Sequence, residues 1–266
     1  MKIALGIEYD GSQFAGWQMQ KHGTRTVQEC VEIALSKVAN QPIQVICAGR
    51  TDTGVHATGQ VVHFECDVLR PEKAWVTGVN TQLPNDVASL WAIQVADDFS
   101  ARFSARARQY RYIISNRASR PAILANKVTW KYGVLNVEAM HQAAQALIGE
   151  QDFTSFRSSA CQAKHARRNI HWIKVTREAD LIYIDIEANA FLHHMVRNIV
   201  GSLIMIGQSV EPVSWMADLL RGKDRNQAGP TAPAEGLYMV KVSYPDETGV
   251  NYKTNLPVFQ KITHIP

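Results

Sequence analysis

The order of the expected strands and helices is the feature that most constrains the fold of this chain. Alternating apolar residues indicate strands, and apolar residues three and four apart indicate helices. These elements come in two similar runs, each in rough outline strand, helix, strand, strand, helix, strand. The order is typical of ferredoxin-like, RNA-recognition-motif-like halves. We therefore expect an α+β (α/β) protein whose two halves share a mostly antiparallel central sheet flanked by helices.

We place the halves at residues 1–104 and 105–266. In the first, the expected strands are 3–9, 43–48, 60–66 and 87–95, and the expected helices are 27–38, after a capping box of Thr26 and Glu29, and 71–80. In the second, the expected strands are 109–114, 170–176, 181–188 and 237–243, and the helices are 137–148, capped by Asn136, 192–204 and 211–220. Residues 153–169 show no periodicity and are expected to form a long surface loop.

The composition is that of an ordinary globular protein, because 46% of the 266 residues are hydrophobic and 20% are charged. Lysine and arginine exceed aspartate and glutamate by 28 − 24 = 4, which permits an anionic partner without requiring one. No apolar run approaches the roughly 18 residues that cross a bilayer, and the early charge of Lys2 argues against a signal peptide. The four cysteines have neither paired spacing nor a histidine at zinc-site spacing. We expect a cytoplasmic protein with reduced thiols and no bound metal.

Residues 49–59 read Gly-Arg-Thr-Asp-Thr-Gly-Val-His-Ala-Thr-Gly and lie between two β-type runs, so they form a loop. Aspartate beside threonine and glycine is common turn chemistry, and a plain connection is one interpretation. The other is that Asp52 is a catalytic carboxylate, kept ionised by Arg50 or another cation and presented to a cleft. The glycines allow the backbone to approach a ligand closely, which the second interpretation requires, although composition alone favours the first.

Asp52-Thr53-Gly54 is also the tripeptide of aspartic proteases, in which two aspartates share one proton. The chain contains no second Asp-Thr-Gly or Asp-Ser-Gly, and Arg50 stands two residues before the acid. A symmetric dimer can supply the second aspartate, but a neighbouring cation disfavours a shared proton. The protease remains a minor alternative.

Two segments are basic and free of acids. The first holds six arginines between residues 101 and 120, and it overlaps the repeat Phe99-Ser100-Ala101-Arg102, Phe103-Ser104-Ala105-Arg106. Arginines four apart share a face of either a helix or a strand, which suits a nucleic-acid backbone. The alternative is a set of arginines whose stems cover the core. The second segment holds Lys164, His165, Arg167 and Arg168, and both resemble electrostatic footprints for phosphates.

Three further features allow two interpretations each. Tyr110 on the strand 109–114 is either a packing residue or a ring that stacks on a base. Asp185 and Glu187 share a face of one strand and form either a polar face, which we favour, or a carboxylate pair for glycoside chemistry. His193 and His194 are expected on a helix, where adjacent side chains diverge by about 100° and cannot bind one metal together.

Several segments together resemble one family, the TruA-type tRNA pseudouridine synthases. They occur in the family's order across nearly the whole chain. The matching segments are Gly49-Arg50-Thr51-Asp52-Thr53-Gly54-Val55-His56-Ala57, Phe99-Ser100-Ala101-Arg102-Phe103-Ser104-Ala105, Tyr110-Arg111-Tyr112, Phe191-Leu192-His193-His194-Met195-Val196-Arg197-Asn198 and Ala232-Pro233-Ala234-Glu235-Gly236-Leu237-Tyr238. The first and fourth are the most specific.

The resemblance implies the pseudouridine synthase fold and isomerisation of uridine to pseudouridine at positions 38, 39 and 40 in the anticodon stem-loop of tRNA, without cofactor or metal. By the same resemblance Asp52 is the nucleophile and Arg50 assists base flipping. Tyr110 and Leu237 hold the uracil, Arg197 is the partner of the carboxylate, and the second half completes the active-site cleft. The family is homodimeric, and each tRNA lies across both subunits.

Residues that contact tRNA are expected in the two basic segments. The resemblance implies Arg102 and the 160–164 region, and the basic patterns extend the set. The expected residues are Phe99, Arg102, Phe103, Arg106, Lys164, Arg167 and Arg168. A non-catalytic RNA-binding module accounts for both basic segments as well, but it gives no reason for an acid between cations, because a carboxylate repels phosphates.

Overall fold

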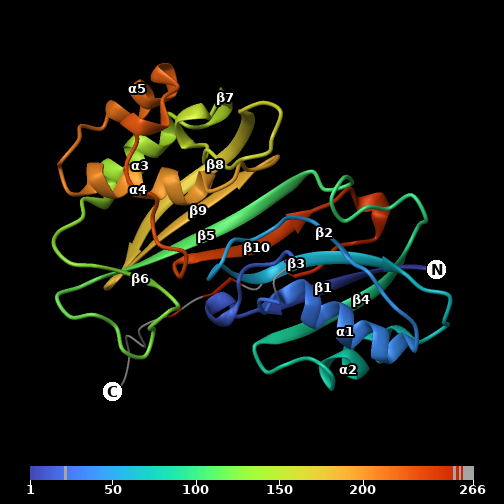
Figure 1. The fold of residues 1–266 in the computed structure, drawn as a ribbon. Helices are drawn as coiled ribbons and strands as arrows, with labels where there is room; N and C mark the ends of the chain where they lie inside the picture. The colour runs from blue at the N-terminus through green and yellow to red at the C-terminus, as the bar shows by residue number, and fades with distance from the viewer. Residues whose placement is uncertain (21–22, 254–255, 258, 260–266) are drawn as a thin grey trace. The chain divides into compact units, whose positions relative to one another are not determined.

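The structure is a computed structural model that describes residues 1–266 except 21–22, 254–255, 258 and 260–266 (Figure 1). The chain forms two compact units. Unit 1 comprises Met1–Arg108 and Tyr238–Leu256, and unit 2 comprises Gln109–Leu237 and Pro257–Pro266. Among the described residues no helix is both long enough and apolar enough to span a membrane.

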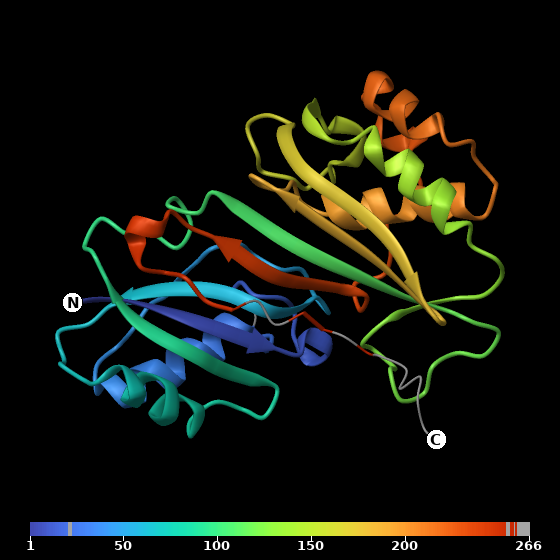
Figure 2. The ribbon, with the colours of Figure 1, turned by 180° about the vertical axis from the view of Figure 1, so that it is seen from behind.

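Unit 1 is a sheet with two helices on one face (Figures 1 and 2). The strands follow the order β4 (Val87–Val95), β1 (Lys2–Tyr9), β3 (His56–Glu65) and β10 (Leu237–Ser243), and β2 (Ile46–Cys47) also pairs with β3. β1 runs antiparallel to both β3 and β4, whereas β10 runs parallel to β3 with Tyr238 opposite His56. The helices are α1 (Val27–Ala39) and α2 (Glu72–Asn80), and α2 packs against β4.

The apolar side chains that alternate along β1 and β3, and those at helical spacing along α1, pack in one core. Leu5, Leu35 and Phe64 are fully buried there, and the Phe64 ring packs edge-on against Trp75 with centroids 5.2 Å apart. Burying side chains of this size stabilises the unit by about 1.5–3 kcal/mol each.

The amino terminus of α1 differs from the expected capping box. Thr26 precedes the helix in an extended conformation, but its side chain makes no capping hydrogen bond. The first helical N–H groups donate instead to loop carbonyls, Val27 N to Gly16 O at 3.3 Å and Gln28 N to Trp17 O at 3.0 Å. A loop distant in sequence thus satisfies the donors that a local side chain was expected to satisfy.

Unit 2 has the same plan, with a sheet and helices on one of its faces. Its strands follow the order β5 (Ala107–Asn116), β9 (Leu181–Ala188), β8 (Arg167–Glu178) and β7 (Gly149–Asp152), and β6 (Thr129–Lys131) pairs in parallel with β5. The helices are α3 (Val137–Gln145), α4 (Met195–Gly207) and α5 (Trp215–Gly222). Asn136 caps α3 as expected, because its Oδ1 accepts from Ala139 N at 3.0 Å.

The expected fold class is confirmed: in each unit the strands are mostly antiparallel and carry helices on one face. The units differ from the division at residue 104 chiefly in the closing strand. Tyr238 to Ser243 belong to unit 1, since β10 pairs with β3. Strand order along the chain does not reveal such a long-range pairing.

Residues 153–169 are not one long loop. Thr154–Phe156 form a 3-10 helix, and Phe153 beside it is fully buried. Arg167 and Arg168 lie at the start of β8, opposite β7. The irregular part is therefore confined to 157–166. The serine-rich composition suggested an exposed loop, but Phe153 and Phe156 are buried and anchor this segment to unit 2.

Candidate functional site

The glycine-rich loop of unit 1 joins β2 to β3 and is held on both sides of Asp52. Tyr9 Oη and Thr51 Oγ1 are 2.7 Å apart, and Trp17 N donates to Thr51 O at 3.0 Å. After the acid, Val55 N donates to Asp52 O at 3.1 Å. Thr51 is buried and Asp52 is half-buried, so the loop presents its carboxylate from a fixed backbone.

Two glycines of residues 11–16, which lie between β1 and α1, allow this segment to pack closely against the loop. A Cβ at Gly11 would lie 2.0 Å from Val55 O, and a Cβ at Gly16 would lie 2.8 Å from Thr51 O. Gly16 also has φ +95°, a conformation that side chains other than glycine rarely adopt. This packing of residues 11–16 against the loop was not predicted from the sequence, because it depends on contacts between residues far apart in the chain.

Phe14 and Trp17, two aromatic residues between β1 and α1, are packing residues. Both rings are buried, Trp17 lies 5.9 Å from the Tyr9 ring, and the Arg25 guanidinium lies 4.1 Å from the centre of the Phe14 ring. These aromatics therefore support the loop from below.

Arg108 joins the first basic segment to the glycine-rich loop. Its Nη2 donates to Ala48 O at 3.0 Å and to Arg102 O at 2.7 Å, and its Nη1 donates to Ala105 O at 3.2 Å. The guanidinium is used to hold three backbone carbonyls. One of the six arginines counted as a phosphate footprint is therefore a structural residue.

The positive charges of Arg50 and Arg102 both favour the ionised thiolate of Cys47. Burial raises the pKa of Cys47 to about 11, and the positive charges of Arg50 and, more weakly, Arg102 oppose that rise. Both side chains are exposed. The loop and the first basic segment thus place two cations on the same part of unit 1.

The phenylalanine-arginine repeat has one buried and one exposed half. Phe99 is only 3% exposed and packs against the rings of His63 and Tyr244, so it is a core residue and not an RNA contact. Phe103 is 80% exposed, and the Arg102 guanidinium lies 5.1 Å from the centre of its ring. The exposed residues of this segment form one surface, which consists of Arg102, Phe103 and Arg106.

In unit 2, Tyr110 on β5 has its ring edge-on to Phe191, with centroids 5.0 Å apart. The next residue, Arg111, forms a bidentate pair with Asp185, with N–O distances of 2.7 and 2.9 Å. Glu187 lies 3.1 Å from His171 Nδ1. Asp185 and Glu187 therefore form the polar strand face that we favoured, each beside a basic residue of another strand.

The turn of residues 228–236 positions both Arg197 and Leu237. Arg197 Nε donates to Ala232 O at 2.8 Å, and Ala232 N donates back to Arg197 O at 3.1 Å. Further along, Tyr112 Oη donates to Pro233 O at 2.8 Å, and Leu237 N donates to Ala234 O at 2.9 Å. The proline and glycine-rich turn thus connects α4 to the residue that begins β10.

The prediction that His193 and His194 diverge because both lie on a helix is wrong. α4 begins at Met195, and His194 precedes it with φ +62°, so the two histidines are not successive helical residues. Their ring centroids are 3.9 Å apart with planes 33° from parallel. The left-handed residue at the helix start turns the two side chains together.

The second basic cluster is divided between a loop and a strand. Lys164 is exposed on the loop, and Arg167 on β8 lies 3.3 Å from Glu150, with both side chains exposed, an arrangement that contributes little to stability. The pKa of Arg168 is lowered, first by burial; the nearby Cys161 raises it, and the positive charge of Arg157 lowers it further.

Cys161 is expected to be the most reactive of the thiols whose pKa is shifted. Burial raises its pKa, but backbone N–H groups of Ala163 and His193 and the charge of Arg157 outweigh burial, so the pKa lies below its usual value. With the pKa of Cys47 near 11, iodoacetamide at pH 7.5 should modify Cys161 at least about a hundredfold faster than Cys47. Peptide mass mapping after timed labelling measures both rates, with Cys161→Ser as the control. Equal rates would contradict the assignment.

Comparison with known proteins gives consistent matches. A family model described as tRNA pseudouridine synthase matches residues 6–104 and 143–245. Proteins named tRNA pseudouridine synthase A are 57% identical in Hydrogenovibrio crunogenus, over 92% of this chain and 93% of the relative, and 61% identical in Salmonella arizonae, over 92% and 90%. The one from Shewanella amazonensis is 58% identical over 97% of this chain and 99% of its own. A solved structure titled Crystal Structure of a Cbf5-Nop10-Gar1 Complex matches 89% of this chain and 57% of its own at 9% identity, with a TM-score of 0.34.

Proposed function

This chain belongs to the tRNA pseudouridine synthase family, and on that premise we propose that it converts uridine to pseudouridine at positions 38, 39 and 40 of the anticodon stem-loop. The enzyme is an isomerase that modifies tRNA. The observation that carries the proposal is the half-buried Asp52 on a loop whose backbone is fixed on both sides, in a chain that is 61% identical to a tRNA pseudouridine synthase A over 92% of its length.

The chemistry needs one well-placed carboxylate. The glycosidic C–N bond of uridine breaks, the uracil turns, a C–C bond forms at its carbon 5, and the hydrogen on that carbon leaves. Nothing is consumed, so the reaction requires no net oxidant or reductant. Hydrolysis would need a second group to activate water. In the isomerisation Asp52 attacks the sugar or the base, and the bond it forms breaks again before the product leaves. The proton lost from carbon 5 is balanced by the proton gained at N1.

The target base must leave its stack before it can react, at a cost of a few kcal/mol. We assign base flipping to Arg50, whose exposed guanidinium lies on the same loop as the acid. Tyr110 is proposed to stack on the uracil and Leu237 to form an apolar wall. Arg197 is proposed as the cation that keeps Asp52 ionised. The hydrogen bonds of the 228–236 turn support the last two roles, because they hold the Arg197 guanidinium and the backbone of Leu237 in place.

The exposed surface of Arg102, Phe103 and Arg106 in unit 1 is proposed to contact tRNA, since an arginine beside an exposed ring suits stacking and phosphate binding together. Lys164, Arg167 and Arg168 are the proposed contacts in unit 2. We propose a homodimer that works in the cytoplasm, where its tRNA substrate is available.

Release of tritium tests the function directly. The wild-type protein, incubated with tRNA carrying uracil tritiated at carbon 5, should release tritium to water in proportion to the pseudouridine formed. Mapping of the product should place the modification at positions 38–40. A non-catalytic RNA-binding module would bind the same tRNA and release no tritium, and an aspartic protease would be indifferent to tRNA; either result would reject the proposal.

A further inference from the structure

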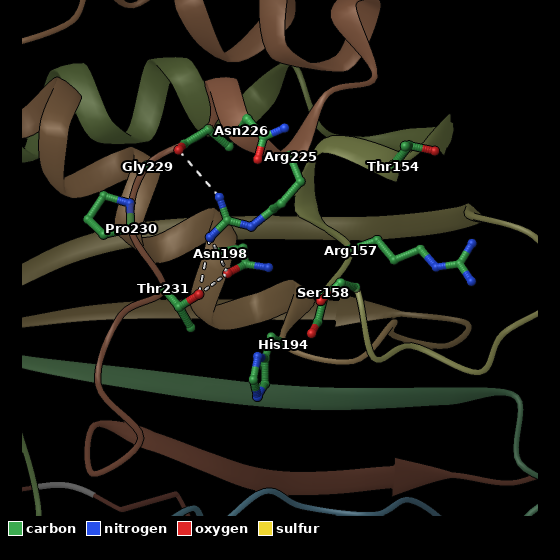
Figure 3. Close-up of a pocket in the computed structure, with 12 residues that line it drawn as sticks. Thr154, Arg157, Ser158, His194, Asn198, Arg225, Asn226, Gly229, Pro230 and Thr231 are labelled. Atoms are coloured by element: carbon green, nitrogen blue, oxygen red, sulfur yellow. Dashed lines mark hydrogen bonds between the residues drawn. The ribbon is translucent and has the colours of Figure 1, made fainter.

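A pocket of about 780 Å³ lies within unit 2, beside the start of α4 (Figure 3). Segments far apart in sequence contribute to it: the 3-10 helix of 154–156 and the residues after it, the residue that precedes α4, and the turn that follows α5. Its lining residues are Thr154, Arg157, Ser158, Ser159, His194, Asn198, Arg225, Asn226, Ala228, Gly229, Pro230 and Thr231. None of them is acidic, and none belongs to the residues assigned above to catalysis or RNA binding.

The pocket carries two arginines without a carboxylate partner among the described residues. Arg157 Nη2 donates to the backbone oxygens of Cys161 and Ala163, at 2.9 and 2.8 Å. Arg225 donates to Ala228 O at 3.3 Å and to two neutral side chains. A guanidinium has five N–H donors, so each arginine keeps donors beyond these bonds. The lining therefore holds positive charge that no acid of the described chain neutralises.

The cation at Arg225 is held in place by neutral acceptors. Its Nη2 donates to Asn198 Oδ1 at 3.0 Å and to Thr231 Oγ1 at 3.1 Å, and Thr231 Oγ1 donates to Asn198 Oδ1 at 2.7 Å, as the dashed lines of Figure 3 show. Asn198 is fully buried, and its Nδ2 donates to Phe156 O at 2.8 Å. This network fixes the guanidinium without cancelling its charge, as expected of an anion site.

We propose that this pocket binds a phosphodiester group of the tRNA backbone. The assignment rests on the proposed function and adds Arg157, Arg225 and Ser158 to the RNA-binding residues. The positive charge of the pocket lies close to the second basic cluster. The charge of Arg157 lowers the pKa of Arg168, and Arg157 Nη2 donates to Ala163 O on the loop that carries Lys164. Hydroxyl groups of the lining, such as that of Ser158, supply neutral donors to phosphate oxygens.

The sharpest test introduces one negative charge into the pocket and leaves the arginine network intact. Ser158→Asp should weaken tRNA binding about tenfold at moderate salt, whereas the neutral Ser158→Asn, which replaces the hydroxyl donor by an amide donor, should weaken it by no more than about threefold. Gln208→Glu adds the same charge at an exposed site of unit 2 and should stay within about twofold of wild type. Arg157→Gln should reduce the slope of log K against log salt by about one. Filter binding over a potassium chloride series gives all four results, and melting curves confirm that each variant is folded.

The outcomes separate this proposal from the function itself. If wild type releases tritium and Ser158→Asp binds tRNA like Ser158→Asn, the pocket assignment fails and the function stands. If wild type releases none, the function fails. Protection of Cys161 from iodoacetamide gives a second readout: tRNA should protect it in wild type and less in Ser158→Asp. Equal protection by inorganic phosphate at the tRNA concentration would assign the pocket to a free anion and overturn the proposal.

Discussion

Asp52→Asn is expected to lower the rate of pseudouridine formation by at least about a thousandfold, because the amide keeps the size of the side chain and loses the charge that makes it a nucleophile. Binding of tRNA should stay within a few-fold of wild type, since a carboxylate repels phosphates and its loss removes no attraction. The loop should keep its conformation, because the neighbouring hydrogen bonds use backbone atoms and Thr51.

Single-turnover tritium release with enzyme in excess measures this loss independently of product dissociation. Asp67→Asn is the matched control, because it makes the same change at an exposed position of unit 1 and should retain full activity. An Asp52→Asn protein that still isomerises uridine at a comparable rate would show that the nucleophile is another residue.

Gly16→Ala should both destabilise unit 1 and impair turnover. The new Cβ would lie 2.8 Å from Thr51 O and 3.1 Å from the carbonyl carbon of Asp52, so either the loop or the Gly16 segment must move. The residue would also adopt φ +95°, at a cost of about 1–2 kcal/mol. We expect a loss of unfolding free energy above about 2 kcal/mol and a turnover rate reduced at least about tenfold in the folded protein, with tRNA affinity affected less.

Gly133→Ala separates backbone strain from displacement of the loop. Gly133 has φ +86°, but a Cβ there meets nothing within 4 Å. It should lose a similar amount of stability to strain and keep its turnover rate. Denaturant unfolding and tritium release, measured on both variants at a temperature where both are folded, give the comparison. Full turnover in Gly16→Ala would mean that the position of the loop backbone does not matter for the reaction.

Residues with the same sequence signature have opposite fates in the structure. Phe99 and Phe103 occupy equivalent places in one repeat, yet the first is buried against His63 and Tyr244 and the second is exposed. The arginines of the first basic segment divide in the same way. Arg108 holds backbone carbonyls, whereas Arg102 faces solvent. Composition and spacing count such residues together, because they carry no information about which partner each will meet.

Local patterns were sufficient where the cause is local. Helical spacing predicted α1, α3 and α4, the Asn136 cap is a contact between near neighbours, and the segment carrying Asp52 pointed to the family. Patterns failed where the partner is remote in the chain. The carbonyls that cap α1 lie ten or more residues away from the donors they satisfy, and β10 pairs with a strand almost two hundred residues earlier.

The sequence by itself therefore determined most of the strands and helices and the family, and it singled out Asp52 as the candidate nucleophile, since each depends on residues that are adjacent or regularly spaced. Only the tertiary structure decided which cations are neutralised and which remain available. Arg111 meets Asp185 across 74 positions of the chain, whereas Arg157 and Arg225 meet neutral oxygens. The physical reason is that the pairing of a charge depends on distance in space, which folding sets and the order of residues does not.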